Sequence, residues 1–171
     1  PADLRTQSGV ALVKETVSDQ IGRIDILINA AGVFGPIQLI GDSDPDRWIE
    51  TITINTVAPY LMCRAFMGDM VDAGFGRIVN VSSAAALHPP GPLNSAYGTS
   101  KVALNQFTRH LAAELQDTGV TANVIHPGEV KTDMWAAIRD EADRLGAEGD
   151  GYRAWVKWVG ETGGDPPGKA A

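Results

Sequence analysis

The sequence has little cysteine, more acidic than basic residues and no long apolar run. A single cysteine, Cys63, excludes an internal disulfide and a cysteine metal cluster. Lys and Arg number 14 against 21 Asp and Glu, which gives a net charge of −7. No basic run offers a track for nucleic-acid phosphates. Because no signal peptide or run of transmembrane length is present, we expect no membrane partner and a reducing compartment such as the cytoplasm.

The composition fits a single globular domain. Of the 171 residues, 44% are hydrophobic and 20% are charged, which allows a real core. No internal repeat or low-complexity linker divides the chain. It begins at Pro1 without an initiator methionine and ends in what looks like an unfinished helix, so we expect both ends to be cuts in a longer chain.

Apolar periodicity predicts alternating helices and strands. We expect helices at residues 8–20, 47–73 and 95–115, and strands at residues 24–28, 77–81 and 121–125. The run at 24–28 is almost wholly apolar, which is typical of a strand covered on both faces. This order predicts an α/β fold with a doubly wound parallel sheet.

Polar or glycine-containing segments follow all three predicted strands. They are NAAG at residues 29–32, SS at 82–83 and HPG at 126–128. In doubly wound sheets the ligand crevice lies beyond the carboxyl ends of the strands. The three segments therefore predict one site at that edge.

The stretch NSAYGTSK places Tyr97 four residues before Lys101, where a Pro- and Gly-rich loop gives way to a helix. Residues at this spacing share a helix face. An ammonium beside a phenol favours the phenolate and lowers its pKa from about 10, which suits acid–base catalysis. The same spacing also arises by chance at an ordinary helix start, so the pair alone is weak evidence.

Serines and an asparagine near these segments have both a chemical and a structural interpretation. Ser83 follows a buried strand, and its hydroxyl is placed to polarise a substrate carbonyl. The alternative, stronger for Ser82 than for Ser83, is that these serines satisfy backbone groups at the strand end. Asn55 lies inside a predicted helix, where asparagine is unfavourable. It either faces solvent or distorts the helix to hold a water.

Five motifs resemble, in order and approximate spacing, those of the short-chain dehydrogenase/reductase family, and the resemblance runs from Asp3 to the last residue. They are NAAG at residues 29–32, Asn55, Ser83, Tyr97-x-x-x-Lys101 and Pro127-Gly-x-Val-x-Thr132. The resemblance implies a Rossmann-type doubly wound parallel sheet that here lacks its first strands and its last strand. The implied function is NAD- or NADP-dependent hydride transfer between a ketone and a secondary alcohol, on a small-molecule substrate and without a metal.

Each motif brings an implied role. Tyr97 would be the catalytic acid/base, Ser83 would polarise the carbonyl, and Lys101 would lower the Tyr97 pKa and bind the nicotinamide ribose. Asn55 would hold, through its backbone, a water that links Lys101 to solvent. The other implied cofactor contacts are Asp3 and Leu4 at the adenine, Asn29, Ala30, Ala31 and Gly32 beside the adenosine ribose, and Pro127, Gly128, Val130 and Thr132 around the nicotinamide carboxamide.

The resemblance also makes residues 133–165 a substrate lid within a single partial domain of residues 1–171. Tyr152, Trp155 and Val159 recur there at helical spacing, which fits either core packing or an apolar pocket wall. His88 and Trp135 are expected to line the substrate. The helices at 47–73 and 95–115 resemble those that form dimer and tetramer contacts in the family, so we expect a homo-oligomer such as a homotetramer.

Two other interpretations stay open. The chain is alternatively a truncated or inactive domain that serves as a binding or oligomerisation module, because the Gly-rich phosphate-binding turn of the family would precede Pro1. A sugar epimerase or dehydratase of the extended relatives shares Tyr-x-x-x-Lys, but the NAAG and PGxVxT segments argue against it. The complete set of Ser83, Tyr97 and Lys101 favours the enzyme.

Overall fold

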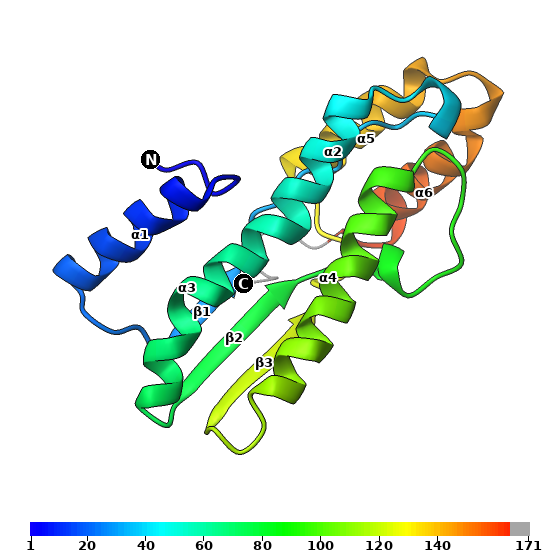
Figure 1. Cartoon of the computed structure of the whole chain (residues 1–171). Helices are drawn as coiled ribbons and strands as arrows, with labels where there is room; N and C mark the ends of the chain where they lie inside the picture. The colour runs from blue at the N-terminus through cyan, green and yellow to red at the C-terminus, as the bar shows by residue number, and fades with distance from the viewer. Residues whose placement is uncertain (165–171) are drawn as a thin grey trace.

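Three parallel strands form the centre of the computed structural model, which describes residues 1–164 (Figure 1). β1 (Ile26–Asn29) pairs with β2 (Gly76–Val81), and β2 pairs with β3 (Val120–Ile125). Asn29 pairs with Asn80, and Val81 pairs with Ile125, so the carboxyl ends of the strands lie at one edge. The predicted α/β fold with a parallel sheet is confirmed.

The three predicted helical ranges are all helical, with small shifts at their ends, and the structure adds two helices after residue 132. The helices are α1 (Gln7–Gln20), α2 (Pro45–Ile52), α3 (Ala58–Asp72), α4 (Ser95–Glu114), α5 (Asp133–Arg144) and α6 (Asp150–Thr162). α2 begins before the predicted residue 47 because the Asp44 side chain accepts hydrogen bonds from the backbone N–H groups of Asp46 and Arg47, as an N-cap does. β1 begins at Ile26 rather than at residue 24.

The long helix predicted for residues 47–73 contains a change of helix type. α2 and α3 are joined by the π-helical turn Thr53–Val57, which contains Asn55. Such turns inside α-helices are rare and often occur at functional sites. Asn55 is fully buried. The prediction that the helix is distorted at Asn55 is confirmed, and the solvent-facing alternative is wrong.

Helices α3 and α4 pack against one face of the sheet, and α1 packs beside α3 (Figure 1). The main core lies in this layer and includes Leu27, Ile78 and Ala122 from the strands and Met62, Phe66, Met70, Leu111 and Leu115 from the helix side. On the opposite face Ile26 and Ile28 are 59% and 61% exposed. The prediction that this strand is covered on both faces is therefore wrong for the described residues, since none of their helices packs over that face.

A smaller apolar cluster, the satellite cluster, joins α5 and α6 to the loops that follow β1 and precede α4. Its buried members are Ile37, Leu93 and Ile138, and its partly buried members are Phe34, Met134, Leu145, Tyr152, Trp155 and Val156. Val159 on α6 is also buried. The stripe predicted within residues 133–165 therefore contributes to packing, and its alternative role as a pocket wall stays a prediction. Residue 165, the last of the predicted lid, lies outside the described residues.

Candidate active site

The residues predicted to carry the chemistry lie on three segments that meet at the carboxyl edge of the sheet. Ser83 follows β2, Asn55 lies on the π turn, and Tyr97 and Lys101 lie at the start of α4. Ser100 on α4 connects two of these segments, because its hydroxyl accepts a hydrogen bond from Asn55 Nδ2 (3.0 Å) and donates one to the Tyr97 carbonyl (2.7 Å). The sequence prediction therefore selected residues that the fold brings together.

Tyr97 is half-buried, and its ring stacks on that of Phe34 with a centroid distance of 4.6 Å and an interplanar angle of 27°. Burial raises the pKa of the Tyr97 phenol, an interaction with the Ser83 hydroxyl opposes this, and the negative charge of Glu129 adds to the increase. The net shift of the Tyr97 pKa is thus upward, opposite in direction to the effect expected of Lys101, whose role stays a prediction. Desolvation dominates because a buried phenolate loses more solvation than its neighbours restore.

Lys101 is only 5% exposed. Its ammonium donates a hydrogen bond to the Val81 carbonyl (2.9 Å) and lies 5.6 Å from the ring centroid of Tyr97. Burial lowers the pKa of this ammonium to about 8, since water no longer stabilises the charge. The ammonium therefore lies beside the phenol, as the i, i+4 spacing predicts.

Asn55 fixes the loop that follows β1. Its Oδ1 accepts a hydrogen bond from the Val33 backbone N–H (2.9 Å), and its Nδ2 donates to the Val33 carbonyl (2.8 Å). The amide side chain thus satisfies both backbone groups of Val33, which a neighbouring strand would otherwise have to do. The side chain of Asn55 is thus structural, and its implied role in holding a water concerns only its backbone.

The two serines after β2 differ in their contacts. Ser82 is buried, and its hydroxyl donates a hydrogen bond to the Lys101 carbonyl (3.4 Å) of helix α4, rather than to a backbone group at the strand end. Ser83 is less buried, and its Oγ accepts a hydrogen bond from the Ala85 backbone N–H (3.2 Å) at the start of the 3₁₀ turn Ala84–Ala86. This cap leaves the Ser83 hydroxyl hydrogen available to donate.

A line of buried amide and hydroxyl groups runs between the sheet and the helices. Asn29 Nδ2 donates to Asn80 Oδ1 (2.8 Å), and Asn80 Nδ2 donates to Thr108 Oγ1 (2.8 Å). Asn29 Nδ2 also contacts Cys63 Sγ (3.4 Å). Burial raises the pKa of the Cys63 thiol to about 11, so this cysteine is a buried neutral group.

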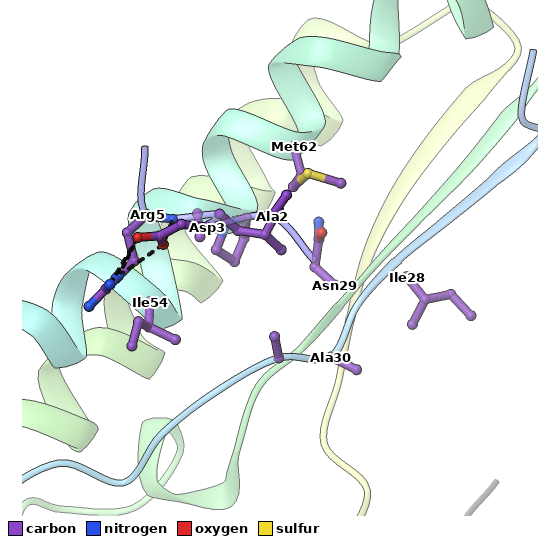
Figure 2. A pocket seen from close by; sticks show the side chains of 12 residues that line it. Ala2, Asp3, Arg5, Ile28, Asn29, Ala30, Ile54 and Met62 are labelled. Atoms are coloured by element: carbon purple, nitrogen blue, oxygen red, sulfur yellow. Dashed lines mark hydrogen bonds and ion pairs between the residues drawn. The ribbon is translucent and has the colours of Figure 1, made fainter. Parts of the chain in front are cut away.

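A cavity of about 320 Å³ opens at the carboxyl end of β1 (Figure 2). Five residues with implied cofactor roles line it: Asp3, Leu4, Asn29, Ala30 and Ala31. Arg5 pairs with Asp3 (2.9 Å) and Glu50 (2.6 Å) at its rim, and the hydrogen bonds from Arg5 lower the pKa of the Asp3 carboxyl. Gly32 lies further along, where an added Cβ would lie 3.2 Å from Asn55 Oδ1 and 3.6 Å from Lys101 Nζ.

The segment after β3 contains the remaining four residues with implied cofactor roles. Pro127 and Gly128 are exposed and Val130 is half-buried. Thr132 caps α5, because its Oγ1 accepts a hydrogen bond from the Trp135 backbone N–H (3.4 Å). This segment follows the strand next to β2, so it borders the same edge as Ser83.

The two residues expected to line the substrate are less closely tied to the site. His88 is exposed in the loop between β2 and α4. Trp135 is half-buried on α5 under the guanidinium of Arg139, 5.5 Å from its ring centroid. Among the described residues, neither side chain has a hydrogen bond or ring contact with Tyr97.

Several site residues escaped the sequence analysis: Phe34, Asn80, Ser100, Thr108 and Glu129. A polar residue inside an apolar strand, as at Asn80, is a usable signal because buried amides require partners. Phe34 gives no comparable signal, since its importance comes from a contact with Tyr97 across the fold.

The part of the chain that the structure describes offers no candidate metal site and no candidate membrane-spanning helix. Residues 1–164 contain no group of three or more His, Cys, Asp or Glu side chains arranged to hold a metal ion. None of the helices in this range is both long enough and apolar enough to cross a membrane.

Known sequences similar to this chain are dehydrogenases and reductases. The dehydrogenase subunit BbsD of Thauera aromatica, which acts on (2S)-[(R)-hydroxy(phenyl)methyl]succinyl-CoA, is 38% identical over 143 residues, covering 82% of this chain and 55% of BbsD. The 2,3-dihydro-2,3-dihydroxybenzoate dehydrogenase of Bacillus subtilis is 34% identical over 142 residues, covering 82% and 54%. The chain spans about half the length of the curated relatives it matches.

Solved structures agree with this relationship. The KRED1-Pglu enzyme superposes with a TM-score of 0.87 at 28% identity, covering 98% of this chain and 68% of that enzyme. A metagenomic short-chain oxidoreductase in complex with NADP gives a TM-score of 0.69 at 32% identity, covering 86% and 67%. The family model described as short chain dehydrogenase matches residues 1–143. The chain therefore belongs to the short chain dehydrogenase family.

Proposed function

We propose that this chain is the catalytic part of an NAD- or NADP-dependent oxidoreductase that interconverts a ketone and a secondary alcohol. The observation that carries the proposal is the meeting of Ser83, Tyr97 and Lys101 at one edge of the sheet. Each group has a donor or a charge suited to a reacting oxygen, and a binding module has no evident need for all three. Relatives named as a dehydrogenase and as a 3-oxoacyl-[acyl-carrier-protein] reductase support the reaction class.

The cavity beside β1 fits the adenosine part of a dinucleotide. Its volume of about 320 Å³ lies in the range of about 300–1,000 Å³ that is usual for ligand sites. Ala30 and Ala31 line it with small side chains, so that a ligand can approach the backbone closely. The carboxylate of Asp3 offers a hydrogen-bond acceptor to an exocyclic amine. Relatives solved with NAD⁺ and with NADP support either dinucleotide. A bound nicotinamide would supply or accept the hydride.

In the reducing direction, the chain's own groups manage the carbonyl oxygen. The Ser83 hydroxyl donates a hydrogen bond to this oxygen and polarises the carbonyl bond. Tyr97 gives its proton to the same oxygen as negative charge develops there. Because burial raises its pKa, the phenol is protonated at neutral pH and holds the proton that it transfers. In the oxidising direction, the phenolate takes the proton from the alcohol.

Lys101 lies in position to stabilise the phenolate that remains after proton transfer. Its ammonium is 5.6 Å from the phenol ring centroid, in a site where burial strengthens the attraction between opposite charges. We further assign it to the nicotinamide ribose, and the backbone of Asn55 to the water that links it to solvent. Pro127, Gly128, Val130 and Thr132 then border the nicotinamide.

Residues 133–165 form the substrate lid in this proposal, within one Rossmann-like domain of residues 1–171, and His88 and Trp135 face the substrate. The protein assembles as a homo-oligomer, a dimer or a homotetramer, through the helical segments α2–α3 and α4. Val57, Tyr60 and Val102 are exposed on these helices, and apolar surface of this kind favours association. The cytoplasm remains the expected compartment.

The test is Tyr97→Phe, which removes the proton donor and keeps the ring. We expect turnover of ketones with NADH or NADPH to fall on the order of 10²–10⁴-fold, while cofactor binding, followed by fluorescence titration, stays nearly unchanged. Tyr60→Phe is the matched control, since Tyr60 is an exposed phenol on α3. Unchanged turnover in Tyr97→Phe would overturn the assignment.

The role of Lys101 has a separate test. Lys101→Ala is expected to alter the pH–rate profile, because the charge next to the phenol is removed. A variant that keeps the full wild-type profile would show that Lys101 does not act on Tyr97. Cofactor binding without any turnover in the wild-type protein would instead support a binding module.

A further inference from the structure

Three aromatic rings connect the acid–base residue to the helix that begins at Asp150. Phe34 stacks on Tyr97 at 4.6 Å between centroids, and Tyr152 on α6 meets Phe34 edge-on at 6.2 Å and 85°. Both arrangements are favourable for aromatic pairs, worth about 0.5–1.5 kcal/mol beyond the area they bury. The rings come from the loop after β1, from α4 and from α6.

The central ring, Phe34, is fixed by the backbone on both of its sides. On one side, Val33 is held through its N–H and its carbonyl by Asn55. On the other side, Gly35 adopts a φ of 78°, and a Cβ at this position would overlap the hydroxyl of buried Thr51. Only glycine takes this conformation and this close approach without strain. The loop therefore presents Phe34 to Tyr97 in one orientation.

We propose that Phe34 is a positioning residue for Tyr97, and that Tyr152 couples the placement of helix α6 to it. This inference rests on the proposed role of Tyr97 as the acid/base. A ring stacked on the phenol ring restricts its rotation and keeps water from one face. Because α6 belongs to the segment assigned as the substrate lid, movement of α6 changes how firmly Phe34 holds the phenol.

Charged and titratable groups also face this site from the packed elements. Lys101 lies on the same helix as Tyr97, Glu129 comes from the segment after β3, and Tyr152 reaches Tyr97 only through Phe34. Burial is the main reason that the pKa of Tyr97 is raised. Removing the covering ring admits water and is expected to move this pKa down toward its ordinary value of about 10.

The experiment compares Phe34→Ala with Phe34→Tyr in the full chain. Misplacement of a catalytic group by about 1 Å costs on the order of 10²-fold, so we expect kcat of Phe34→Ala to fall about 10- to 100-fold with little change in KM. Phe34→Tyr keeps the stack and is expected to retain kcat. Phe34→Leu keeps apolar volume without a ring and gives the same comparison if the alanine variant fails to fold.

A second measurement does not depend on turnover. Tyrosine labelled with ¹³C at Cζ reports the Tyr97 pKa by NMR, and the Tyr97 signal is the one lost in Tyr97→Phe. We expect this pKa to be lower in Phe34→Ala than in the wild type and unchanged in Phe34→Tyr. Tyr152→Ala is expected to lower kcat by a smaller factor than Phe34→Ala, and the exposed Trp158 on α6 provides the control Trp158→Ala.

The outcomes separate this inference from the function on which it rests. Retained turnover in Tyr97→Phe would overturn the proposed function. If Tyr97→Phe is inactive while Phe34→Ala keeps its kcat and its Tyr97 pKa, the positioning role is wrong. Equal losses in Phe34→Tyr and Phe34→Ala would also contradict it, because the stack alone cannot then be responsible. A Tyr152→Ala variant that behaves like Trp158→Ala would remove the coupling to α6.

Discussion

Between the sheet and helices α3 and α4, the buried groups nearest the site are polar, whereas under α5 and α6 they are apolar and aromatic. The first region contains Asn55, Asn80, Ser100 and Thr108, which form hydrogen bonds with donor–acceptor distances of 2.8–3.0 Å. The second region is the satellite cluster around Ile37, Leu93 and Ile138. Tyr97 contacts both, through Ser100 on one side and Phe34 on the other.

The two regions restrict Tyr97 by different physics. A hydrogen bond is directional, and a buried donor or acceptor that loses its partner costs about 1–3 kcal/mol. Apolar packing has no such direction, and replacements that conserve shape usually cost under about 1.5 kcal/mol. We therefore expect shape-conserving substitutions to be costly in the polar region and mild in the satellite cluster.

The largest expected effect on stability comes from Asn55→Leu. The leucine fills a similar volume but leaves the N–H and carbonyl of Val33 and the hydroxyl of Ser100 without their partner. We expect the free energy of unfolding to fall by about 3–5 kcal/mol, measured by urea denaturation. The control is Thr53→Val on the same π turn, whose hydroxyl donates only to the Ile49 carbonyl (2.9 Å). Equal losses in the two variants would remove the distinction between the regions.

The second largest effect depends on pH and concerns the one buried cation of the described residues. The pKa of Lys101 is about 8 in the folded chain and 10.5 without burial. Below pH 8 both states are charged, and the folded state carries the full cost of the buried ammonium. Between pH 8 and 10.5 the unfolded state binds more protons, so the stability of the wild type rises with pH by about 3 kcal/mol at most.

Lys101→Met provides the comparison for this effect. The raised pKa values of Cys63 and Tyr152 lower stability at alkaline pH in both proteins, so they cancel in the difference. We expect the unfolding free energy of the wild type to increase relative to that of Lys101→Met from pH 8 to pH 10.5. A difference that stays constant across this range would mean that the ammonium keeps an ordinary pKa in the fold.

Periodicity was sufficient to predict the three strands, the helical ranges before residue 116 and the edge at which the site lies. Apolar runs and turn residues carry that information locally, which is why Ser83, Tyr97 and Lys101 fall where the sequence places them. Whether helices cover a given face of a strand does not depend on the local sequence alone. The run at 24–28 has the composition of a doubly covered strand, yet Ile26 and Ile28 are exposed because coverage depends on which helices pack there.

The partners of the site residues were beyond prediction for the same reason. Nothing in the sequence near Asn55 indicates that its amide pairs with Val33, and nothing near Phe34 indicates a stack on Tyr97. The pKa of Tyr97 shows the consequence. The i, i+4 spacing predicted an ammonium beside the phenol and a lowered pKa. Burial of the phenol by the surrounding rings and loops decides the direction of the pKa shift instead.

In the satellite cluster, a substitution that removes one methylene should have a modest effect. Ile138 on α5 is buried against Ile37 and Leu93. We expect Ile138→Val to lower the free energy of unfolding by about 1 kcal/mol, because it removes one buried group and leaves only a small cavity. Urea denaturation measures this loss directly. Ala137→Gly is not a suitable comparison, because glycine lowers the stability of the helix itself. A loss as large as that of Asn55→Leu would show that the cluster is as restrictive as the polar region.

The smallest expected effect is that of Tyr152→Phe. Burial raises the pKa of this phenol to about 12, and no hydrogen bond of its hydroxyl is found within residues 1–164. The substitution keeps the ring and its edge contact with Phe34. We therefore expect a change within about 0.5 kcal/mol in unfolding free energy and no change in kcat. A loss above about 1 kcal/mol would mean that the hydroxyl is bonded, and that the apolar side of Tyr97 also depends on a directional contact.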